Sequence, residues 1–530
     1  MKNIKSKNIW ISILLIGLNS CQQIDNKTQR TATDNFQFEE ITIFELQQGF
    51  KNEDYTITDV VQAYLGRIKA IDQNGPRLNS IIQVNPDALR IAEELDKEIA
   101  EGKIMGPMHG VPVILKDNID TNDKMATTAG SRALAGSYAL EDSFIVKKLR
   151  EGGAVILAKA NLSEWANFRD SLSSSGWSGL GGQTSNPYII DRNPCGSSSG
   201  SAVAVSANLC MVAIGTETNG SIVCPSTTNG IVGIKPTVGL LSRSGIIPIS
   251  FTQDTPGPMA RTITDAAICL GVMTGIDKAD SKTLNSEGKY HTDYTQFLAK
   301  DGLMGKRIGW YKKPSGKHYK VDDLMEQTVE YLKSQGVEII EIESFTDVKV
   351  GGLSFTVMLY EFKDGLNQYF GSRGPDTPVK SLKELIKFNK VDPVELKYFG
   401  QGIFETSEEK GDLETPEYND ALTKMLTAMR EEGIDRVMDE HDLDAIIAPT
   451  GGPAWKTDLV NGDSFHVGSS SPAAIAGYPN ITVPMGFIDG LPVGVSFFGR
   501  AWSEPVLIEI AYAYEQGTKH RRVPQFNLSD

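Results

Sequence analysis

The sequence lacks the features that several enzyme and binding classes require. It has only 6 histidines in 530 residues, and it contains no Walker A loop, zinc-ligand pair or dinucleotide-binding glycine pattern. We therefore expect no metal and no organic cofactor. Basic side chains are also few, since 52 lysines and arginines stand against 67 acids, for a formal net charge of -15. Because nucleic-acid binding needs a basic footprint, we expect no nucleic-acid partner.

Cysteine is scarce as well. The 5 cysteines are an odd number in a long chain, which does not describe a disulfide scaffold. Apart from Cys21, they are expected to be small buried residues, because free cysteine is among the most buried residue types. One disulfide among Cys195, Cys210, Cys224 and Cys269 stays open if the compartment is oxidising.

The N-terminus has the pattern of an export signal. Three lysines precede the apolar run 9–18, which is too short for a permanent membrane-spanning helix. Residues 18–21 resemble the lipobox of bacterial lipoproteins, in which the cysteine is diacylated and becomes the new N-terminus. We therefore predict a lipoprotein signal peptide over residues 1–20 and lipid attachment at Cys21. An ordinary signal peptide followed by a chance cysteine is the alternative.

The residues after the predicted cleavage site indicate a location. Gln22 stands where inner-membrane retention uses aspartate, so the resemblance to lipoproteins implies export to the bacterial outer membrane, on its periplasmic or its outer side. Residues 21–35 are polar and aperiodic, which favours a flexible tether. Membrane contact is expected through the N-terminal lipid alone, because two or more acyl chains anchor a protein firmly.

Helical and strand patterns alternate along the rest of the chain. Residues 61–68 have helical spacing, with Thr58 as the predicted N-cap. An amphipathic helix at 88–100 precedes the apolar run 111–116, which is interpreted as a buried strand ending at Lys116. The later patterns predict helices at 144–152 and 321–335, strands at 154–158, 306–310, 337–340 and 444–449, and a charged, mainly helical stretch at 346–440. Such alternation favours an α/β sheet covered by helices on both faces.

Two serines and one lysine are the candidates for chemistry. Ser197 lies in the Gly-Ser-Ser-Ser-Gly run 196–200, and Ser221 follows two small residues. A serine hydroxyl needs a base to become a nucleophile, and no histidine lies near either serine in the sequence. Lys116 can act as that base if burial lowers its pKa from the ordinary value of about 10.4. The pattern therefore indicates amide hydrolysis by a Ser-Ser-Lys arrangement.

These motifs resemble those of the amidase signature family. The matching segments are 196–200, 216–225, 234–239 and 254–261, the lysine strand 109–117, and the C-terminal blocks 476–479 and 494–499. The resemblance covers residues 38–524, and within the family the chain looks most similar to bacterial peptide amidases. It implies one large α/β domain over residues 36–530, with a mixed central β-sheet covered by helices on both faces. A variable helical, substrate-access region is implied at 275–440.

The resemblance also implies a role for each candidate. Ser221 would attack a carboxamide carbonyl, Ser197 would carry the proton, and Lys116 would accept it. In relatives the residue corresponding to Ser197 is bound through a cis peptide. The oxyanion would be held by the backbone amides of Thr218, Asn219, Gly220 and Ser221. Many relatives have glycine or aspartate in place of Asn219, but asparagine adopts left-handed backbone angles readily, so we expect the oxyanion turn to survive.

The predicted activity is hydrolysis of a linear carboxamide through an acyl-enzyme. By similarity the substrate is a C-terminal peptide amide or another small or short peptide amide, and fatty-acid, aryl and cyclic amides are the alternatives within the family. Two alternatives belong to other classes. One is a surface-binding lipoprotein that has lost catalysis, and the other is a cytoplasmic amidotransferase subunit, which the export signal and the acidic charge disfavour. The sequence makes no prediction of the oligomeric state.

A Ser-His-Asp hydrolase is the remaining alternative. Residues 196–200 formally satisfy the G-x-S-x-G pattern, with Ser198 as the nucleophile. That nucleophile elbow needs a strand immediately before it, whereas residues 192–195 read Arg-Asn-Pro-Cys. The histidine would have to be one of His441, His466 and His520.

Overall fold

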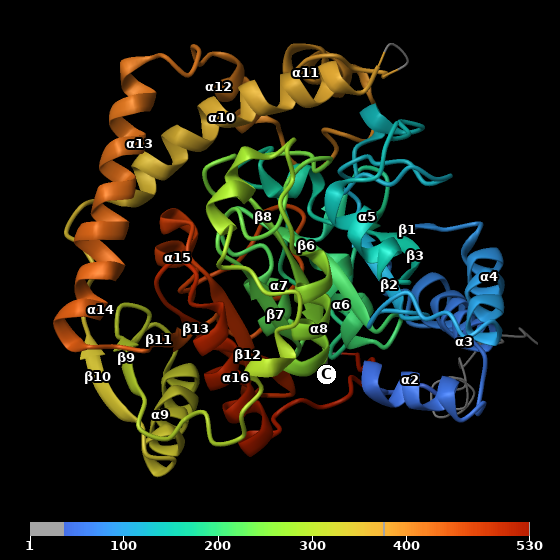
Figure 1. Ribbon diagram of the computed structural model, residues 1–530. Coiled ribbons are helices and arrows are strands. Elements are labelled where there is room, and N and C mark those ends of the chain that lie inside the picture. Colours follow the sequence, from blue (N-terminus) through green and yellow to red (C-terminus); the bar gives the residue numbers. More distant parts are fainter. Residues whose placement is uncertain (1–35, 375–376, 529–530) are drawn as a thin grey trace, which may run out of the picture. The chain divides into compact units, whose positions relative to one another are not determined.

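The computed structural model describes residues 36–374 and 377–528 (Figure 1). The predicted signal peptide, tether and lipidated Cys21 therefore lie outside the described residues. The strands are β1 Ile81–Val84, β2 Pro112–Lys116, β3 Val155–Ala160, β4 Trp177–Ser178, β5 Gly182–Gln183, β6 Val212–Glu217, β7 Val232–Lys235, β8 Thr255–Ala260, β9 Arg307–Tyr311, β10 Glu338–Ile342, β11 Ala445–Pro449, β12 Asn480–Ile488 and β13 Leu491–Phe498.

The α-helices are α2 Ile43–Lys51, α3 Ile57–Arg67, α4 Ala88–Ala100, α5 Phe144–Glu151, α6 Ser199–Ser206, α7 Val223–Thr228, α8 Ile263–Met273, α9 Tyr319–Ser334, α10 Val350–Ser372, α11 Leu382–Val391, α12 Gly402–Glu408, α13 Pro416–Met429, α14 Arg436–His441, α15 Ser471–Ala476 and α16 Glu504–Thr518. Shorter 3₁₀ and π-helical segments are η1 Ile68–Gln73, η2 Arg132–Leu134, η3 Glu164–Asn167, η4 Ser281–Ser286, η5 Thr295–Phe297 and η6 Arg430–Asp435.

Within the described part of the chain, eleven strands form one mixed sheet in the order β1-β3-β2-β6-β8-β7-β12-β13-β11-β9-β10. Strand β2 runs parallel to both β3 and β6, whereas β8 runs antiparallel to β6 and β7. The parallel pair β9 and β10 extends the sheet at one edge. Figure 1 shows helices on both faces of the sheet. The prediction of a single α/β domain with a mixed, helix-covered sheet is confirmed.

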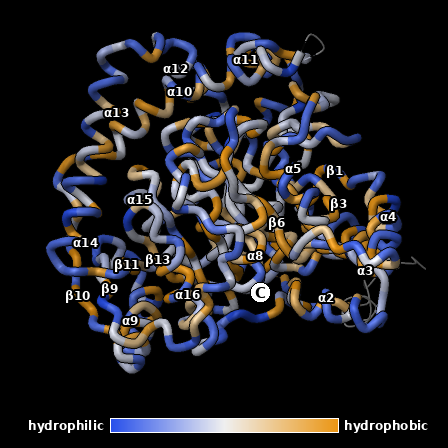
Figure 2. The backbone as a smooth tube through the Cα atoms, in the orientation of Figure 1, coloured by the Kyte–Doolittle hydropathy of each residue, from blue (hydrophilic) through white to orange (hydrophobic). Residues whose placement is uncertain are grey.

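The central strands are buried along their whole length. Every residue of β2, β3, β6, β8 and β13 is buried. Strands covered on both faces read as continuous apolar runs rather than as alternating patterns, which is why the run 111–116 was recognisable. Figure 2 shows the hydrophobic segments gathered near these strands and hydrophilic residues along outer helices such as α4 and α13. A lysine at the end of such a strand is therefore shielded from water.

The boundaries predicted from the sequence agree with the structure for most elements. The helix predicted at 88–100 is α4, with the same bounds. The predicted N-cap Thr58 is wrong, because Thr56 caps α3 and forms a capping box with Asp59. The Thr58 hydroxyl instead donates to an Asp96 carboxylate oxygen at 2.6 Å.

The region predicted as helical at 275–440 also contributes strands β9 and β10, with α9 between them. The chain then forms the arch of helices α10 to α13 (Figure 1). Aromatic side chains join α10 and α12 to η3, since Trp165 of η3 packs edge-on against Phe370 of α10 and Phe404 of α12, and Phe404 stacks on Phe362. These contacts attach the arch firmly next to the segments that carry the predicted site.

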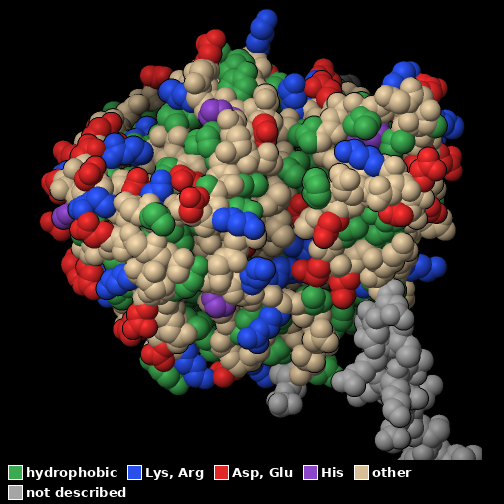
Figure 3. Space-filling model, turned by 60° about the horizontal axis from the view of Figure 1, so that its bottom comes forward, with side chains coloured by type: hydrophobic (Ala, Val, Ile, Leu, Met, Phe, Trp, Pro, Cys, Tyr) green, Lys and Arg blue, Asp and Glu red, His purple; other side chains and the backbone are tan. Residues whose placement is uncertain are grey.

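The described chain from Gln37 onward forms one compact unit. None of its described helices is both long enough and apolar enough to cross a bilayer. On the face shown in Figure 3, basic and acidic side chains are interspersed.

A buried ion-pair group joins the arch to the loops beside the sheet. Arg169 is completely buried, and its guanidinium contacts carboxylate oxygens of Glu164 at 2.5 Å and of Glu395 at 3.2 Å. Both acidic side chains are also completely buried, and burial raises the pKa of Glu164 well above its usual value. The shared cation compensates two carboxylates that would otherwise be costly to remove from water.

Replacing Arg169 by methionine is expected to destabilise the fold by about 3–5 kcal/mol, because it leaves two acids buried together without a cation. Urea unfolding of Arg169→Met measures the loss. The exposed pair Arg436–Glu440 is the control, where Arg436→Met should cost less than about 1 kcal/mol. Equal effects at the two positions would contradict the importance given to the buried group.

Candidate active site

Lys116 stands at the carboxyl end of β2 and is completely buried. Because β2 and β6 are parallel, with Leu115 opposite Ile214, their carboxyl ends meet at one edge of the sheet. Lys116 Nζ lies 2.8 Å from Ser197 Oγ, 2.9 Å from Thr216 Oγ1 and 3.2 Å from the Thr216 carbonyl oxygen. The structure thus brings together the predicted lysine and one of the predicted serines.

The environment of Lys116 favours the neutral amine. Burial lowers the pKa of Lys116 to about 7 and outweighs the opposite influence of the Asp254 and Glu217 carboxylates. A neutral amine has two N–H groups and one lone pair. The two Thr216 oxygens can accept both N–H groups. The lone pair is then left facing the Ser197 hydroxyl.

Ser197 belongs to the buried loop that precedes α6. Its side chain is completely buried. The peptide bond between Gly196 and Ser197 is cis, as the resemblance implied. Ser163 N donates to the Ser197 carbonyl oxygen at 3.1 Å, which joins this loop to the segment after β3.

The sequence left the pairing of the cysteines open. All four described cysteines are buried, as expected, and Cys195 forms a disulfide with Cys224, their Cα atoms being 6.0 Å apart. Cys210 and Cys269 are free. The disulfide joins the loop before Ser197 to helix α7. It therefore ties the two serine-bearing segments together covalently.

Ser221 lies in the turn between β6 and α7 and is partly exposed. Ser198 N donates to the Ser221 carbonyl oxygen at 3.2 Å, which is a second link between the two serine-bearing segments. The Glu217 carboxylate accepts from Ile222 N at 2.8 Å and from Val223 N at 3.1 Å, so it fixes the turn from within. The Ser221 hydroxyl makes no hydrogen bond to any described residue and is free to contact a substrate.

Four consecutive backbone N–H groups at this turn are unused. Among the described residues, none accepts a hydrogen bond from the amides of Thr218, Asn219, Gly220 or Ser221. Thr218 and Gly220 are buried, whereas Asn219 is exposed and Ser221 is partly exposed, so the row lies where an oxygen atom of a ligand could reach it. The oxyanion site that the resemblance implied thus has four candidate donors that no described residue occupies.

The left-handed position of this turn is Gly220, whose φ is +86°. A Cβ atom there would lie 3.0 Å from Ser470 Oγ, which is a tight contact, and the positive φ is the main reason for glycine at this position. The φ of Asn219 is not positive, so the turn does not use the ability of asparagine to adopt a left-handed angle. Its side-chain oxygen instead accepts a hydrogen bond from Ser470 Oγ at 2.7 Å.

The Ser-His-Asp alternative finds no support in the geometry. Ser198 is completely buried; its hydroxyl donates to the Thr216 carbonyl oxygen at 3.1 Å and accepts from Thr216 N at 3.2 Å. No strand covers 192–195. Within the described residues, no hydrogen bond joins Ser198 to His441, His466 or His520. The described residues also contain no group of His, Cys, Asp and Glu arranged to hold a metal ion.

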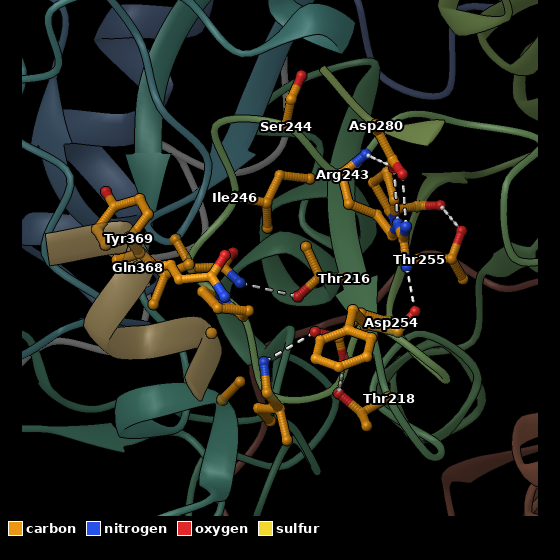
Figure 4. A pocket seen from close by; sticks show the side chains of 18 of the residues that line it. Thr216, Thr218, Arg243, Ser244, Ile246, Asp254, Thr255, Asp280, Gln368 and Tyr369 are labelled. Carbon is orange, nitrogen blue, oxygen red and sulfur yellow. Dashed lines mark hydrogen bonds and ion pairs between the residues drawn. The ribbon is translucent and has the colours of Figure 1, made fainter. Parts of the chain in front are cut away.

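A cavity of about 440 Å³ adjoins the site (Figure 4). Thr216 and Thr218 belong to its wall, whereas the three predicted catalytic side chains do not line it. The ion pair between Arg243 and Asp280 forms another part of the wall. Its apolar lining includes Ile246, Ile247, Pro248, Ile249, Phe251 and Pro256. No sequence pattern indicated this cavity, because its walls come from segments far apart in the chain.

The pKa of Lys116 leads to a pH dependence. If neutral Lys116 takes the proton of the serine relay, the rate at which a fluorophosphonate labels Ser221 should rise with pH, about tenfold per unit below the lysine pKa, and level off above it. The midpoint is expected at about pH 7. Lys116→Met should slow labelling at every pH and remove this rise, while circular dichroism confirms that the variant is folded. A flat wild-type profile would contradict the base role.

Comparison with known proteins shows a likeness over nearly the whole chain. The sequence profile of the Amidase family matches residues 59–508. The chain is 41% identical over 525 residues to a probable amidase of Arabidopsis thaliana, with 97% of each chain covered. Among solved structures, a peptide amidase in complex with the competitive inhibitor chymostatin is 50% identical, with a TM-score of 0.90 and coverage of 92% of this chain and 99% of that chain. The native peptide amidase of Stenotrophomonas maltophilia is 49% identical, with a TM-score of 0.90 and coverage of 93% and 100%. These matches cover the sheet, the turns and the helical arch together, and the chain therefore belongs to the amidase family and is an amidase.

Proposed function

We propose that this amidase hydrolyses linear carboxamides, and C-terminal peptide amides in particular, through an acyl-enzyme formed on Ser221. The observation that carries the proposal is the buried Lys116, whose Nζ lies 2.8 Å from Ser197 Oγ beside the turn that holds Ser221. A lysine with a pKa of about 7 is half neutral near neutral pH and can accept a proton. The likeness to two peptide amidase structures supports the class of substrate.

The arrangement offers a proton path for the attack. Ser221 Oγ forms a bond to the carbonyl carbon while its proton passes to Ser197 Oγ, and the proton of Ser197 passes to Lys116 Nζ. The π electrons of the carbonyl move onto its oxygen, and the resulting oxyanion is met by the unused N–H groups of the turn. Losing one such donor typically costs roughly 10²–10³ in rate.

The same groups act in reverse on the leaving nitrogen. The carbonyl reforms as the C–N bond breaks, Ser197 gives its proton to the nitrogen, and Lys116 returns a proton to Ser197. Ammonia departs and leaves an ester on Ser221. Water then attacks this ester through the same relay, which releases the carboxylate and restores the Ser221 hydroxyl.

Ammonia release tests the proposal directly. The chain beginning at Gln22 should release ammonia from short peptide amides, and Ser221→Ala should release none above background, because no acyl-enzyme can form. Lys116→Ala should lower kcat by at least about 10³, since the relay loses its base, with an unchanged circular dichroism spectrum.

Each remaining outcome identifies one of the alternatives. Release from a fatty-acid, aryl or cyclic amide, with none from peptide amides, would contradict the proposed substrate class but retain the amidase mechanism. A folded chain that is not labelled by fluorophosphonate and cleaves no amide would be the binding lipoprotein without catalysis. Co-purification with a partner subunit would point to the amidotransferase alternative.

We also propose that the chain is exported and lipidated at Cys21, which lies outside the described residues. The Cys195–Cys224 disulfide supports an oxidising compartment, because disulfides persist there. In a bacterial host, the full-length chain should incorporate labelled palmitate and sediment with the outer membrane, and Cys21→Ala should abolish the label. Recovery of an unlabelled, unprocessed chain from the cytoplasm would contradict export.

A further inference from the structure

Thr218 is held from outside the oxyanion turn at two points. Its hydroxyl donates to an Asp254 carboxylate oxygen at 2.5 Å, a contact visible in Figure 4. Its carbonyl oxygen accepts a hydrogen bond from Gln253 Nε2 at 3.3 Å. A trans peptide unit is planar, and its C=O and N–H groups point in opposite directions. By holding the Thr218 carbonyl, Gln253 therefore sets the direction in which the unused Asn219 N–H points.

The segment that supplies these two side chains is itself fixed by hydrogen bonds. The second carboxylate oxygen of Asp254 accepts from Ile249 N at 2.8 Å and from Ser250 N at 2.9 Å, which closes the segment on itself. Gln253 is completely buried. The segment continues directly into β8, whose first residue Thr255 pairs with Glu217 at the end of β6. Its position relative to the oxyanion turn is therefore defined by the sheet.

Helix α10 holds this segment at two places. Ser354 Oγ donates to Gln253 Oε1 at 2.7 Å. Seven residues later, on the same face of the helix, the buried Glu361 carboxylate accepts from Thr252 N at 3.1 Å and from the Ser250 hydroxyl. The arch thus reaches the oxyanion turn through two successive hydrogen bonds, from Ser354 to Gln253 and from Gln253 to Thr218.

Helix α13 strengthens the same connection. Tyr418 OH donates to the Glu361 carboxylate at 2.8 Å. The carboxylate therefore receives donors from both the segment before β8 and the far side of the arch. Such a buried acid with all its donors in place has one well-defined orientation.

We propose that the helical arch positions the Asn219 N–H for the oxyanion, with Ser354 holding Gln253 directly and Glu361 holding the adjoining residues Ser250 and Thr252, a proposal that rests on the proposed amide hydrolysis. These are positioning residues, because none of them touches the reacting atoms. Oxyanion donors work by being oriented before the reaction, and a misplacement of about 1 Å can cost about 10² in rate. The helical arch would thus orient an oxyanion donor in addition to packing beside the sheet.

Two variants test the connection by removing different numbers of its hydrogen bonds. Gln253→Leu removes both hydrogen bonds of the link, and Ser354→Ala removes only the hold of α10 on Gln253. The matched control is Asn389→Leu, which deletes a buried side-chain amide on α11 whose partner is Gln401 at 3.0 Å and which has no link to Thr218. Fluorophosphonate titration counts the active sites of each preparation, so kcat refers to folded enzyme alone.

The measurements separate positioning from a purely structural role. They are kcat and KM for a peptide amide, and the inhibition constants of a peptide aldehyde and of the corresponding peptide alcohol. Ser221 adds to the aldehyde and places an oxygen in the oxyanion site, whereas the alcohol binds without forming that oxygen. Gln253→Leu should lower kcat by about 10- to 100-fold, and Ser354→Ala by a smaller factor, with KM nearly unchanged. Aldehyde binding should weaken by a similar factor, while alcohol binding stays the same.

Each other result overturns a definite statement. If the wild-type enzyme cleaves the peptide amide and both Gln253→Leu and Ser354→Ala have the same kcat per titrated site as the wild type, the positioning link is refuted and the proposed function is not. Equal weakening of aldehyde and alcohol, or a matching fall of kcat in Asn389→Leu, would show a general loss of packing and refute it as well. A wild-type enzyme that neither labels at Ser221 nor cleaves amides would refute the proposed function, and the link with it. If Gln253→Leu fails to fold, the milder Ser354→Ala decides.

Discussion

The burial of one amine at the carboxyl end of β2 is the constraint on which the site depends. Lys116 is enclosed by strands that are buried on both faces, so water cannot stabilise its ammonium form, and its pKa falls to about 7. The neutral amine is useful only if its lone pair faces a proton donor. Two oxygens of Thr216 occupy its N–H groups and leave the lone pair to Ser197. Burial of a lysine normally lowers stability, but here it gives the amine a pKa suited to the proposed role as a base near neutral pH.

Strand β6 organises the rest of the site around this amine. Successive side chains of a strand point to opposite faces, and the last two residues of β6 and the residue that follows it serve three separate purposes. Thr216 holds the lysine, Glu217 binds the amides at the start of α7, and Thr218 is held by Asp254. The contacts of Glu217 and Thr218 thereby fix the turn that follows, while no described residue accepts a hydrogen bond from the N–H groups of residues 218–221. The disulfide and the arch act on the same turn from further away.

Local sequence patterns predicted much of the fold because the central strands and amphipathic helices have strong hydrophobic signatures. The helix at 88–100 and the strand ending at Lys116 follow from burial on one or both faces. The error at the start of α3 lay where two neighbouring residues compete for one local role. Thr56 caps α3 in place of Thr58 because Asp59 completes its capping box. Periodicity does not distinguish such neighbours.

By itself, the sequence determined the α/β class, the resemblance to amidases and the identity of the three candidate side chains, because these depend on residue type and on contiguous motifs. Only the tertiary structure decided that Lys116 meets both Ser197 and Thr216, that Cys195 pairs with Cys224, and that Ser354 reaches Gln253. Each of these contacts joins residues from separate elements. Their formation depends on strand order and helix packing, and the pKa of a lysine depends on how completely those elements exclude water.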